Sequence, residues 1–442
     1  MKTSTNAPHV AVIGGGICGL AAAHRLARRG VRVTLLEASD QLGGLGTFFA
    51  RGDQWVERFY HCIMPTDDEL LRLLGELGLE SAVRWRKTTM GMIVDGRHHR
   101  FNSALDLLRF TPLRFDDRVR FGAVSLLLRR LGQGRDLDSL RTEDWLRGLY
   151  GRRVWENLFA PMFGSKFGAS FGDVPALYLW QRLGRERNVA TRGYPAGGYK
   201  AIIDALRSSI ESAGGTVRTA APVHRLSSTA AGCALTWADG EVLDVDQVLS
   251  TVPLPLLRRL ADDELAARLP RSDLRYQGVV TAAFFLRRPL TGHYWTPVLR
   301  SATGFDGVVE MSALAGTEAY GGLHLAYVMR YTDRGSRLYD EPADGIAARW
   351  SAQLMSLHPG LHADDIADVR VFKAPFVEPV YPLNYLALRP PVVVEDTNVL
   401  LATTAHVYPD VTSWNSSVAL ANAVTNRILA VRERPEAGEP VR

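Results

Sequence analysis

Three glycines with a fixed spacing are the clearest candidates for ligand binding in this sequence. Gly14, Gly16 and Gly19 form a Gly-x-Gly-x-x-Gly pattern between an apolar segment and a predicted helix. In that context the first glycine allows a tight turn, the second lets the backbone approach a pyrophosphate, and the third lets the helix pack closely on the strand. The loop residues Ile17 and Cys18 and the N-terminus of the helix that follows then present unpaired N–H groups to the phosphates. The pattern predicts a dinucleotide site, and a glycine turn without a ligand is the alternative.

An acidic residue after this loop narrows the choice of dinucleotide. Glu37, followed by Ala38, closes the second predicted strand. A carboxylate there accepts hydrogen bonds from both hydroxyls of an adenosine ribose and disfavours a 2′-phosphate. The sequence therefore favours FAD or NAD over NADP.

The elements that would position these residues form a complete strand–turn–helix–strand unit. An apolar strand is predicted at 10–13, a helix at 20–29 that Gly30 stops, and a second strand at 31–36. This order is typical of a Rossmann-like α/β fold.

The rest of the chain divides into a helical region and several strands. A capping box at 66–69 opens a short helix, and residues 103–187 are mostly helical. Strands recur afterwards. Apolar and polar residues alternate in four of them, at 277–285, 293–299, 308–311 and 323–331, and this predicts an antiparallel sheet. The strands predicted in this part of the chain are 216–218, 223–226, 245–251, 277–285, 293–299, 308–311, 323–331, 369–380 and 398–402, with a last helix at 416–431.

Composition places the chain among ordinary globular proteins. It has 442 residues, of which 46% are hydrophobic and 22% charged, and no apolar run reaches the roughly 18 residues that a membrane span needs. The cysteines Cys18, Cys62 and Cys233 are too few and too scattered for a disulfide framework or a zinc site. We therefore expect no metal and a reducing, cytoplasmic location.

The net charge of +5 is unevenly distributed. Residues 84–192 contain 21 basic and 11 acidic residues. This middle segment is therefore positively charged, and the rest of the chain carries a net negative charge. Such a region indicates an anionic ligand or surface nearby, and arginine suits phosphate because its planar fork donates two parallel hydrogen bonds. Solvated helix faces are the alternative.

One helix of this basic region has apolar residues between basic ends. Residues 116–131 could lie on a membrane surface or bind a partner, although ordinary amphipathic packing is favoured. Aromatic residues do not interleave with the basic ones, which argues against a nucleic-acid partner.

The segment after the second strand resembles a known superfamily. Residues 37–46 read Glu-Ala-Ser-Asp-Gln-Leu-Gly-Gly-Leu-Gly and resemble the glycine pair of amine oxidase and protoporphyrinogen oxidase-like flavoproteins. The resemblance implies FAD, with Gly43, Gly44, Leu45 and Gly46 beside its pyrophosphate. Gln41 and Leu45 stand where such proteins often have an arginine. A later segment at 221–226 is also similar, and there Val223 is the position whose backbone pairs with adenine.

The C-terminal segment instead resembles UDP-galactopyranose mutase. Tyr408 and Asp410 match a Tyr-x-Tyr-x-Asp segment of that family, and His406 replaces the first tyrosine. The resemblance implies that the following helix, near Asn415, points its N-terminus at the flavin. A helix N-terminus there would stabilise the negative charge of reduced flavin.

A histidine ahead of the capped helix is the first candidate for proton transfer. His61 matches a histidine that the mutase family places beside the flavin. It could take a proton when a substrate C–H leaves as hydride, with Glu57 or Tyr60 orienting its ring. A core histidine satisfied by backbone is the alternative.

The helical region offers further candidates. Lys166, between apolar and glycine residues, is either a buried amine with a shifted pKa or an exposed loop residue, and the second is slightly favoured. Arginines cluster before Tyr194 and could hold a diphosphate of the substrate, with solvated helix ends as the alternative. They are Arg182, Arg185, Arg187 and Arg192. Tyr194 is a further candidate for substrate binding.

These observations predict an FAD-binding domain with a helical insertion and an antiparallel-sheet substrate domain. The FAD domain is expected at 7–95, 193–255 and 372–432, the insertion at 96–192 and the sheet at 256–371.

Three functions are consistent with this architecture. The first is an FAD-dependent oxidoreductase that moves a hydride between flavin N5 and a small, sugar-like or phosphorylated substrate. The second is a redox-neutral sugar mutase in which reduced flavin attacks a sugar carbon. The third is a non-enzymatic binding protein similar to Rab GDP-dissociation inhibitors, against which the intact glycine loop argues.

Overall fold

The predicted N-terminal unit is the centre of a five-stranded parallel sheet. The computed structural model describes residues 8–185, 190–237, 240–271, 274–333 and 335–432. In this sheet the strand order is β19-β13-β1-β2-β9, so segments far apart in sequence lie side by side. The strands are β1 His9–Ile13, β2 Arg32–Leu36, β9 Thr216–Arg218, β13 Gln247–Ser250 and β19 Val399–Leu401.

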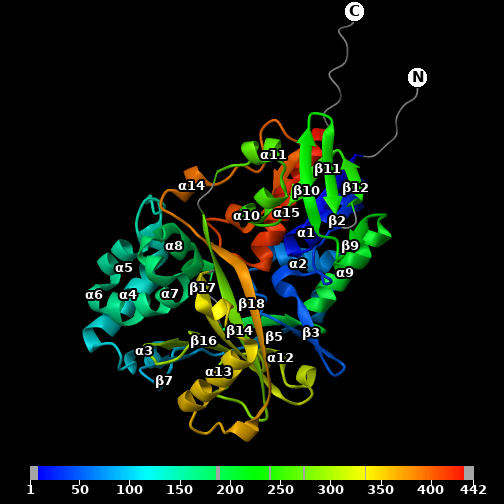
Figure 1. Cartoon of the computed structure of the whole chain (residues 1–442). Coiled ribbons are helices and arrows are strands. Elements are labelled where there is room, and N and C mark those ends of the chain that lie inside the picture. Colours follow the sequence, from blue (N-terminus) through cyan, green and yellow to red (C-terminus); the bar gives the residue numbers. More distant parts are fainter. Residues whose placement is uncertain (1–7, 186–189, 238–239, 272–273, 334, 433–442) are drawn as a thin grey trace, which may run out of the picture.

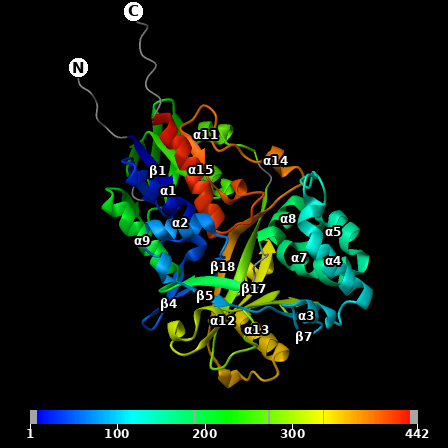
Figure 2. The ribbon, with the colours of Figure 1, turned by 180° about the vertical axis from the view of Figure 1, so that it is seen from behind.

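Both faces of the parallel sheet are covered, which explains its nearly continuous apolar strands. Val10 and Val12 of β1 face four helices, whereas Ala11 and Ile13 face a three-stranded antiparallel sheet. Figure 2 shows the helices grouped on the first side. They are α1 Ile17–Arg28, α2 Asp68–Glu76, α9 Gly198–Ser212 and α15 Trp414–Arg432. The second side carries β10 Val223–Thr229, β11 Gly232–Trp237, β12 Val242–Val245, α10 Leu254–Leu260 and α11 Asp263–Arg268.

A seven-stranded sheet forms the lower lobe in Figure 1. Its order is β18-β14-β17-β16-β15-β6-β7, and every pair is antiparallel except β15 with β6. Helix α13 Ala343–Leu357 packs on one face of it. The strands are β6 Gly91–Val94, β7 Arg97–Arg100, β14 Arg275–Leu286, β15 Trp295–Leu299, β16 Gly307–Glu310, β17 His324–Asp333 and β18 Ile366–Val380.

The basic middle of the chain forms a helical lobe beside this sheet, seen on the left of Figure 1. An aromatic-rich core holds it together. A π-helical turn at Trp155–Phe159 lies inside it. The helices are α3 Ala104–Leu108, α4 Phe115–Gly132, α5 Thr142–Tyr150, α6 Arg152–Val154, α7 Ala160–Phe167 and α8 Ala176–Arg185.

Short elements connect these lobes. Hairpin β3 Phe48–Arg51 with β4 Gln54–Glu57 follows the glycine pair, and β5 Val83–Lys87 pairs with β8 Thr191–Pro195. Helices α12 Ser312–Ala315 and α14 Tyr385–Leu388 complete the chain. The predicted fold class, with its helical insertion and antiparallel sheet, is confirmed. The domain boundaries stay a prediction. Strand β18 extends across the one between residues 371 and 372, and β6, which lies in the predicted FAD domain, pairs within the lower sheet.

Candidate functional site

The glycine loop forms a cradle between β1 and α1. Gly14 has a φ of +107°, a conformation that favours glycine, and a Cβ at Gly19 would overlap the Gly14 carbonyl. A Cβ at Gly16, by contrast, would meet nothing closer than Gly44 Cα at 4.0 Å. The turn and the tight helix packing are therefore as expected, and the space in front of Gly16 is open, as a pyrophosphate requires.

The predicted glycine pair lies directly beside this loop and extends the cradle. Gly43 N donates to Gly15 O at 2.8 Å, and Gly43 and Gly44 have φ values of +122° and +59°. A 3₁₀ turn at Gly44–Gly46 then carries Leu45, and Gly46 packs against the Trp414 ring. The two motifs are thus in direct contact, and together they present a glycine backbone surface that fits the phosphates of FAD.

Glu37 lies beside the cradle, where an adenosine ribose is expected. Its Oε2 accepts a hydrogen bond from Gly15 N at 2.7 Å, and its Oε1 accepts one from Ser39 N at 2.9 Å. Ala38 next to it is exposed. Val223 begins the adjacent strand β10, so the three segments expected around adenosine converge here.

Two predicted loop residues begin helix α1. Ile17 is buried in the core, and Cys18 Sγ donates to Ala402 O at 3.5 Å. Burial raises the pKa of the Cys18 thiol to about 12, so this cysteine stays protonated and unreactive at neutral pH. The backbone of both residues remains the part suited to phosphates.

His61 lies where helix α15 meets the cradle. Its Nδ1 donates to the Phe59 carbonyl at 2.9 Å, and its ring centre is 4.9 Å from Tyr199 and 5.9 Å from Trp414. Burial lowers the pKa of His61 to about 4, so the imidazole is neutral at pH 7. With Nδ1 protonated, Nε2 keeps a lone pair that can accept a proton.

Glu57 is hydrogen-bonded to residues other than His61. Its carboxylate accepts the Tyr194 hydroxyl at 2.7 Å and the Tyr199 N–H at 2.8 Å. Burial raises the pKa of Glu57 despite these hydrogen bonds. The expectation that Glu57 or Tyr60 orients His61 was wrong, because the hydrogen bond of the ring goes to the backbone. Tyr194, predicted to bind substrate, instead holds Glu57.

Lys166 is not the exposed loop residue that the sequence favoured. It lies in α7, its side chain is 15% exposed, and its Nζ is 2.8 Å from Glu378 Oε2 of β18. Glu378 is 4% exposed and also accepts the Tyr178 hydroxyl. Burial alone would raise the pKa of Glu378, but the charges of Lys166 and Arg182 outweigh it and hold this pKa below its usual value.

Aromatic residues join this ion pair to the His61 segment. Tyr60, next to His61, has its hydroxyl 3.5 Å from that of Tyr331, and Lys166 Nζ lies 5.6 Å from the Tyr331 ring centre. The Tyr60 ring also stacks at 6.5 Å on Trp295. A chain of aromatic and polar contacts therefore runs from the His61 segment to Lys166, through residues of α7, β15, β17 and β18.

The predicted arginine cluster is divided in the structure. Arg192 is 6% exposed in β8, where its guanidinium lies 4.6 Å from the Tyr294 ring and donates to Thr88. Arg182 lies in α8, and its positive charge lowers the pKa of Glu378. Of Arg185 only the backbone is described, and Arg187 lies outside the described residues.

The predicted mutase-like residues have structural contacts. His406 caps a 3₁₀ turn through Thr403, and Tyr408 donates to Asp138 inside an aromatic cluster. Asn415 Oδ1 accepts the N–H groups of Glu69 and Leu70, so it caps the start of α2. Asp410 donates its backbone N–H to Val407 O at 3.0 Å.

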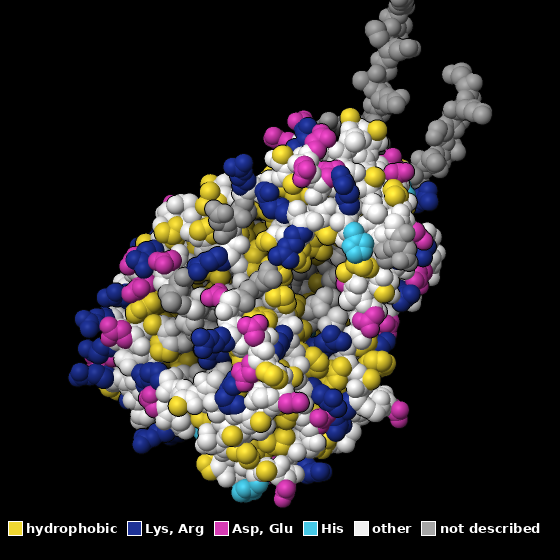
Figure 3. Space-filling view, in the orientation of Figure 1, with side chains coloured by type: hydrophobic (Ala, Val, Ile, Leu, Met, Phe, Trp, Pro, Cys, Tyr) yellow, Lys and Arg dark blue, Asp and Glu magenta, His cyan; other side chains and the backbone are white. Residues whose placement is uncertain are grey.

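Sequence reasoning missed three residues of this site, namely Glu378, Tyr178 and Tyr331. One signal was present, because Glu378 is a carboxylate within the apolar run of β18. A buried strand carries such a residue only when a partner neutralises it. Figure 3 shows that the molecular surface is hollowed between the lobes, with hydrophobic and Lys or Arg side chains around the hollow.

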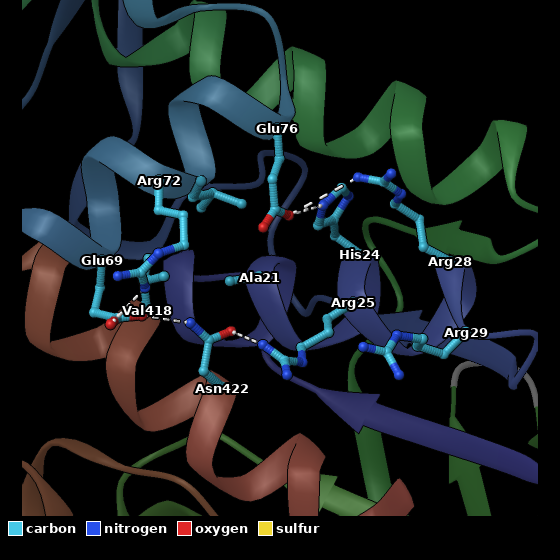
Figure 4. A pocket seen from close by; sticks show the side chains of 11 residues that line it. Ala21, His24, Arg25, Arg28, Arg29, Glu69, Arg72, Glu76, Val418 and Asn422 are labelled. Carbon is cyan, nitrogen blue, oxygen red and sulfur yellow. Dashed lines mark hydrogen bonds and ion pairs between the residues drawn. The ribbon is translucent and has the colours of Figure 1, made fainter.

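A separate groove of about 480 Å³ lies on the outer side of α1, α2 and α15. Figure 4 shows ion pairs and hydrogen bonds among its charged and polar side chains. Arg72 lies 2.6 Å from Glu69, His24 lies 3.4 Å from Glu76, and Arg25 donates to Asn422 at 2.9 Å. None of its lining residues was predicted as a site residue, and the pairs tie the three helices together.

Comparisons with known proteins agree with this geometry. The profile of a family described as flavin containing amine oxidoreductase matches residues 17–412. The chain is 25% identical over 316 residues to the flavin-containing amine oxidase B of Sus scrofa, covering 64% of this chain and 58% of that protein. It spans little more than half the length of the first curated relatives that it matches.

Solved structures share the fold. A protein from Exiguobacterium sp. 255-15, provisionally named a protoporphyrinogen oxidase, superposes with a TM-score of 0.77 at 17% identity, over 98% of this chain and 100% of that one. Reduced UDP-galactopyranose mutase superposes with a TM-score of 0.74 at 16% identity, over 97% and 96%. The family profile confirms the expected superfamily, and the superpositions show that the chain shares its fold with the mutase. No helix within the described ranges is long and apolar enough to cross a membrane.

Proposed function

Because the chain belongs to the family of flavin-containing amine oxidoreductases, whose cofactor is FAD, we propose that it oxidises or reduces a small molecule by hydride transfer. The observation that carries this proposal is the side-chain-free backbone where the two glycine motifs meet, because a Cβ at Gly16 would contact nothing closer than Gly44 Cα. When bound, FAD supplies the hydride acceptor or donor.

His61 is the group that moves the proton. When a carbon that bears an oxygen or nitrogen atom loses a hydride, that oxygen or nitrogen releases a proton. A neutral imidazole whose Nδ1 is fixed by the Phe59 carbonyl presents Nε2 as the acceptor. The rings of Tyr199 and Trp414 hold that imidazole in place.

Lys166 and its neighbours bind and orient the substrate. The ammonium is fixed by Glu378 in a largely buried place, and the rings of Tyr331 and Phe167 lie 5.6 Å and 5.3 Å away. A held cation among aromatic rings suits a sugar-like molecule, whose hydroxyls accept hydrogen bonds, or one that bears phosphate. The basic character of the helical lobe supports an anionic substrate.

Anaerobic reduction tests this function. The holoenzyme is mixed with candidate sugars, phosphorylated sugars and amines, and the flavin absorbance near the visible maximum is followed. We expect one class to bleach the flavin, and Lys166→Met to raise the KM for that class more than it lowers kcat. Purified protein without flavin, which added FAD does not reconstitute, would contradict the proposal.

A redox-neutral mutase reaction is the second candidate. Tyr408 and Asp410 of the mutase-like segment and the superposition on reduced UDP-galactopyranose mutase favour it. Its mark is turnover that begins only after dithionite reduction and leaves no net oxidation. A colourless protein that binds a partner would instead favour the third, non-enzymatic candidate.

A further inference from the structure

Helices α3 and α4 expose an unusual number of large apolar side chains. Twelve such side chains are exposed among the described residues, and six of them lie on these two helices. We call these six the α3–α4 face. They are Leu105 at 53%, Leu108 at 45%, Phe115 at 67%, Val119 at 50%, Leu126 at 85% and Leu127 at 47% exposed.

This exposure is concentrated on one side of α4. Phe115, Val119 and Leu126 are separated by four and seven residues, so they share one face of the helix. The opposite side already packs inward, where Leu128 is buried in the core of the helical lobe. The ordinary packing that the sequence favoured for residues 116–131 therefore accounts for only one side, and an exposed apolar patch of this kind marks an interaction surface.

The charges around the α3–α4 face are mainly positive. Residues 102–135 contain seven arginines and three aspartates. Two of the aspartates, Asp116 and Asp117, are paired with Arg153 of α6. Arg109 and Arg130 are exposed at the surface. The face thus combines apolar side chains with an excess of cations.

We propose that the α3–α4 face docks on a lipid bilayer that contains acidic phospholipids. Leu and Phe side chains enter the boundary between headgroups and acyl chains, and the arginines bind the lipid phosphates. A second copy of this chain fits less well, because an isologous contact would bring the same arginines together. The bilayer is favoured by this charge complementarity, and the proposal is independent of the reaction that the protein performs.

Vesicle sedimentation of the holoenzyme tests the proposal. The probes are phosphatidylcholine vesicles with and without phosphatidylglycerol. We expect binding only to the acidic vesicles, weakened by salt. The double variant Phe115→Gln/Leu126→Gln should bind at least about tenfold more weakly. Its control is Val242→Gln/Leu388→Gln. These two side chains are 61% and 60% exposed but lie outside the α3–α4 face, so the control should bind as wild type does.

A second pair of variants tests the charges. Arg109→Gln/Arg130→Gln should bind about thirtyfold more weakly to acidic vesicles, whereas Arg225→Gln/Arg259→Gln, also exposed, should not change binding. Flavin content and thermal unfolding should match wild type in all four variants. The proposal is overturned if wild-type protein does not bind acidic vesicles, or if each variant binds them as strongly as its control does. A concentration-dependent dimer that Phe115→Gln/Leu126→Gln abolishes would also overturn it in favour of a second copy.

Discussion

Lys166 Nζ and Glu378 Oε2 lie 2.8 Å apart and join the helical lobe to the longest strand of the lower sheet. Glu378 is almost fully buried, and Lys166 is mostly so. The ion pair therefore attaches the helical lobe to the lower sheet and also fixes a positive charge in the candidate site.

Removing one partner of this pair should be costly. Glu378→Ala leaves a buried ammonium without its counter-ion, so we expect the free energy of unfolding to fall by about 3 to 5 kcal/mol. Urea unfolding measures it. Asp204→Ala is the matched control, because Asp204 pairs with Lys200 at 2.5 Å but is 56% exposed. That change should cost less than about 1 kcal/mol. Equal losses in the two variants would mean that Glu378 contributes no more than a surface acid.

His61 predicts a particular pH dependence. Its folded pKa of about 4 lies below the usual 6.5, so the unfolded chain binds more protons between these values. Its contribution to stability is thus complete above pH 6.5 and is lost as the pH falls toward 4. We expect urea unfolding of His61→Phe to depend less steeply on pH in this window than unfolding of wild type. The remaining slope comes from other buried histidines such as His358 and His406, whose pKa burial also lowers. An unchanged slope would show that His61 is solvated.

The cradle predicts a variant that folds but does not hold flavin. Gly16 has φ −69° and ψ 173°, which valine adopts without strain, and the added side chain would enter the open space. We expect Gly16→Val to be purified folded, with under about a tenth of the wild-type flavin absorbance. Circular dichroism checks the fold. Gly148→Ala, where a Cβ meets nothing within 4 Å, should keep full flavin content. Normal flavin content in Gly16→Val would place the cofactor elsewhere.

Asn415 predicts a stability effect without a spectral one. Its side chain caps α2 through two hydrogen bonds at 2.9 Å and 3.0 Å. Asn415→Ala should therefore cost about 1 to 2 kcal/mol in thermal or urea unfolding. The flavin spectrum should be that of wild type. A shifted spectrum with unchanged stability would instead support the contact with flavin that the sequence resemblance implied.

The part of the site that sequence predicted is the part made by neighbouring residues. Gly14, Gly16, Gly19 and Glu37 belong to one local unit, and their roles follow from spacing and strand order. The fold class followed from the same unit and from the alternation of the later strands.

The part that sequence missed depends on residues distant in the chain. Lys166 reads as exposed until β18 brings Glu378 to it, and the sequence around Asn415 does not show that its side chain caps α2 until α15 docks there. For α4, periodicity could not show which apolar side chains the core had room to cover, and Leu126 remained outside. Tertiary docking decided each of these three cases.

The order of strands in the parallel sheet has a consequence for biosynthesis. The edge strand β19 and the Trp414 ring that packs on Gly46 come from a part of the chain far from β1. A ribosome must consequently have released every residue from β1 to Trp414 before the nucleotide can be enclosed. Flavin capture then follows translation of all these segments.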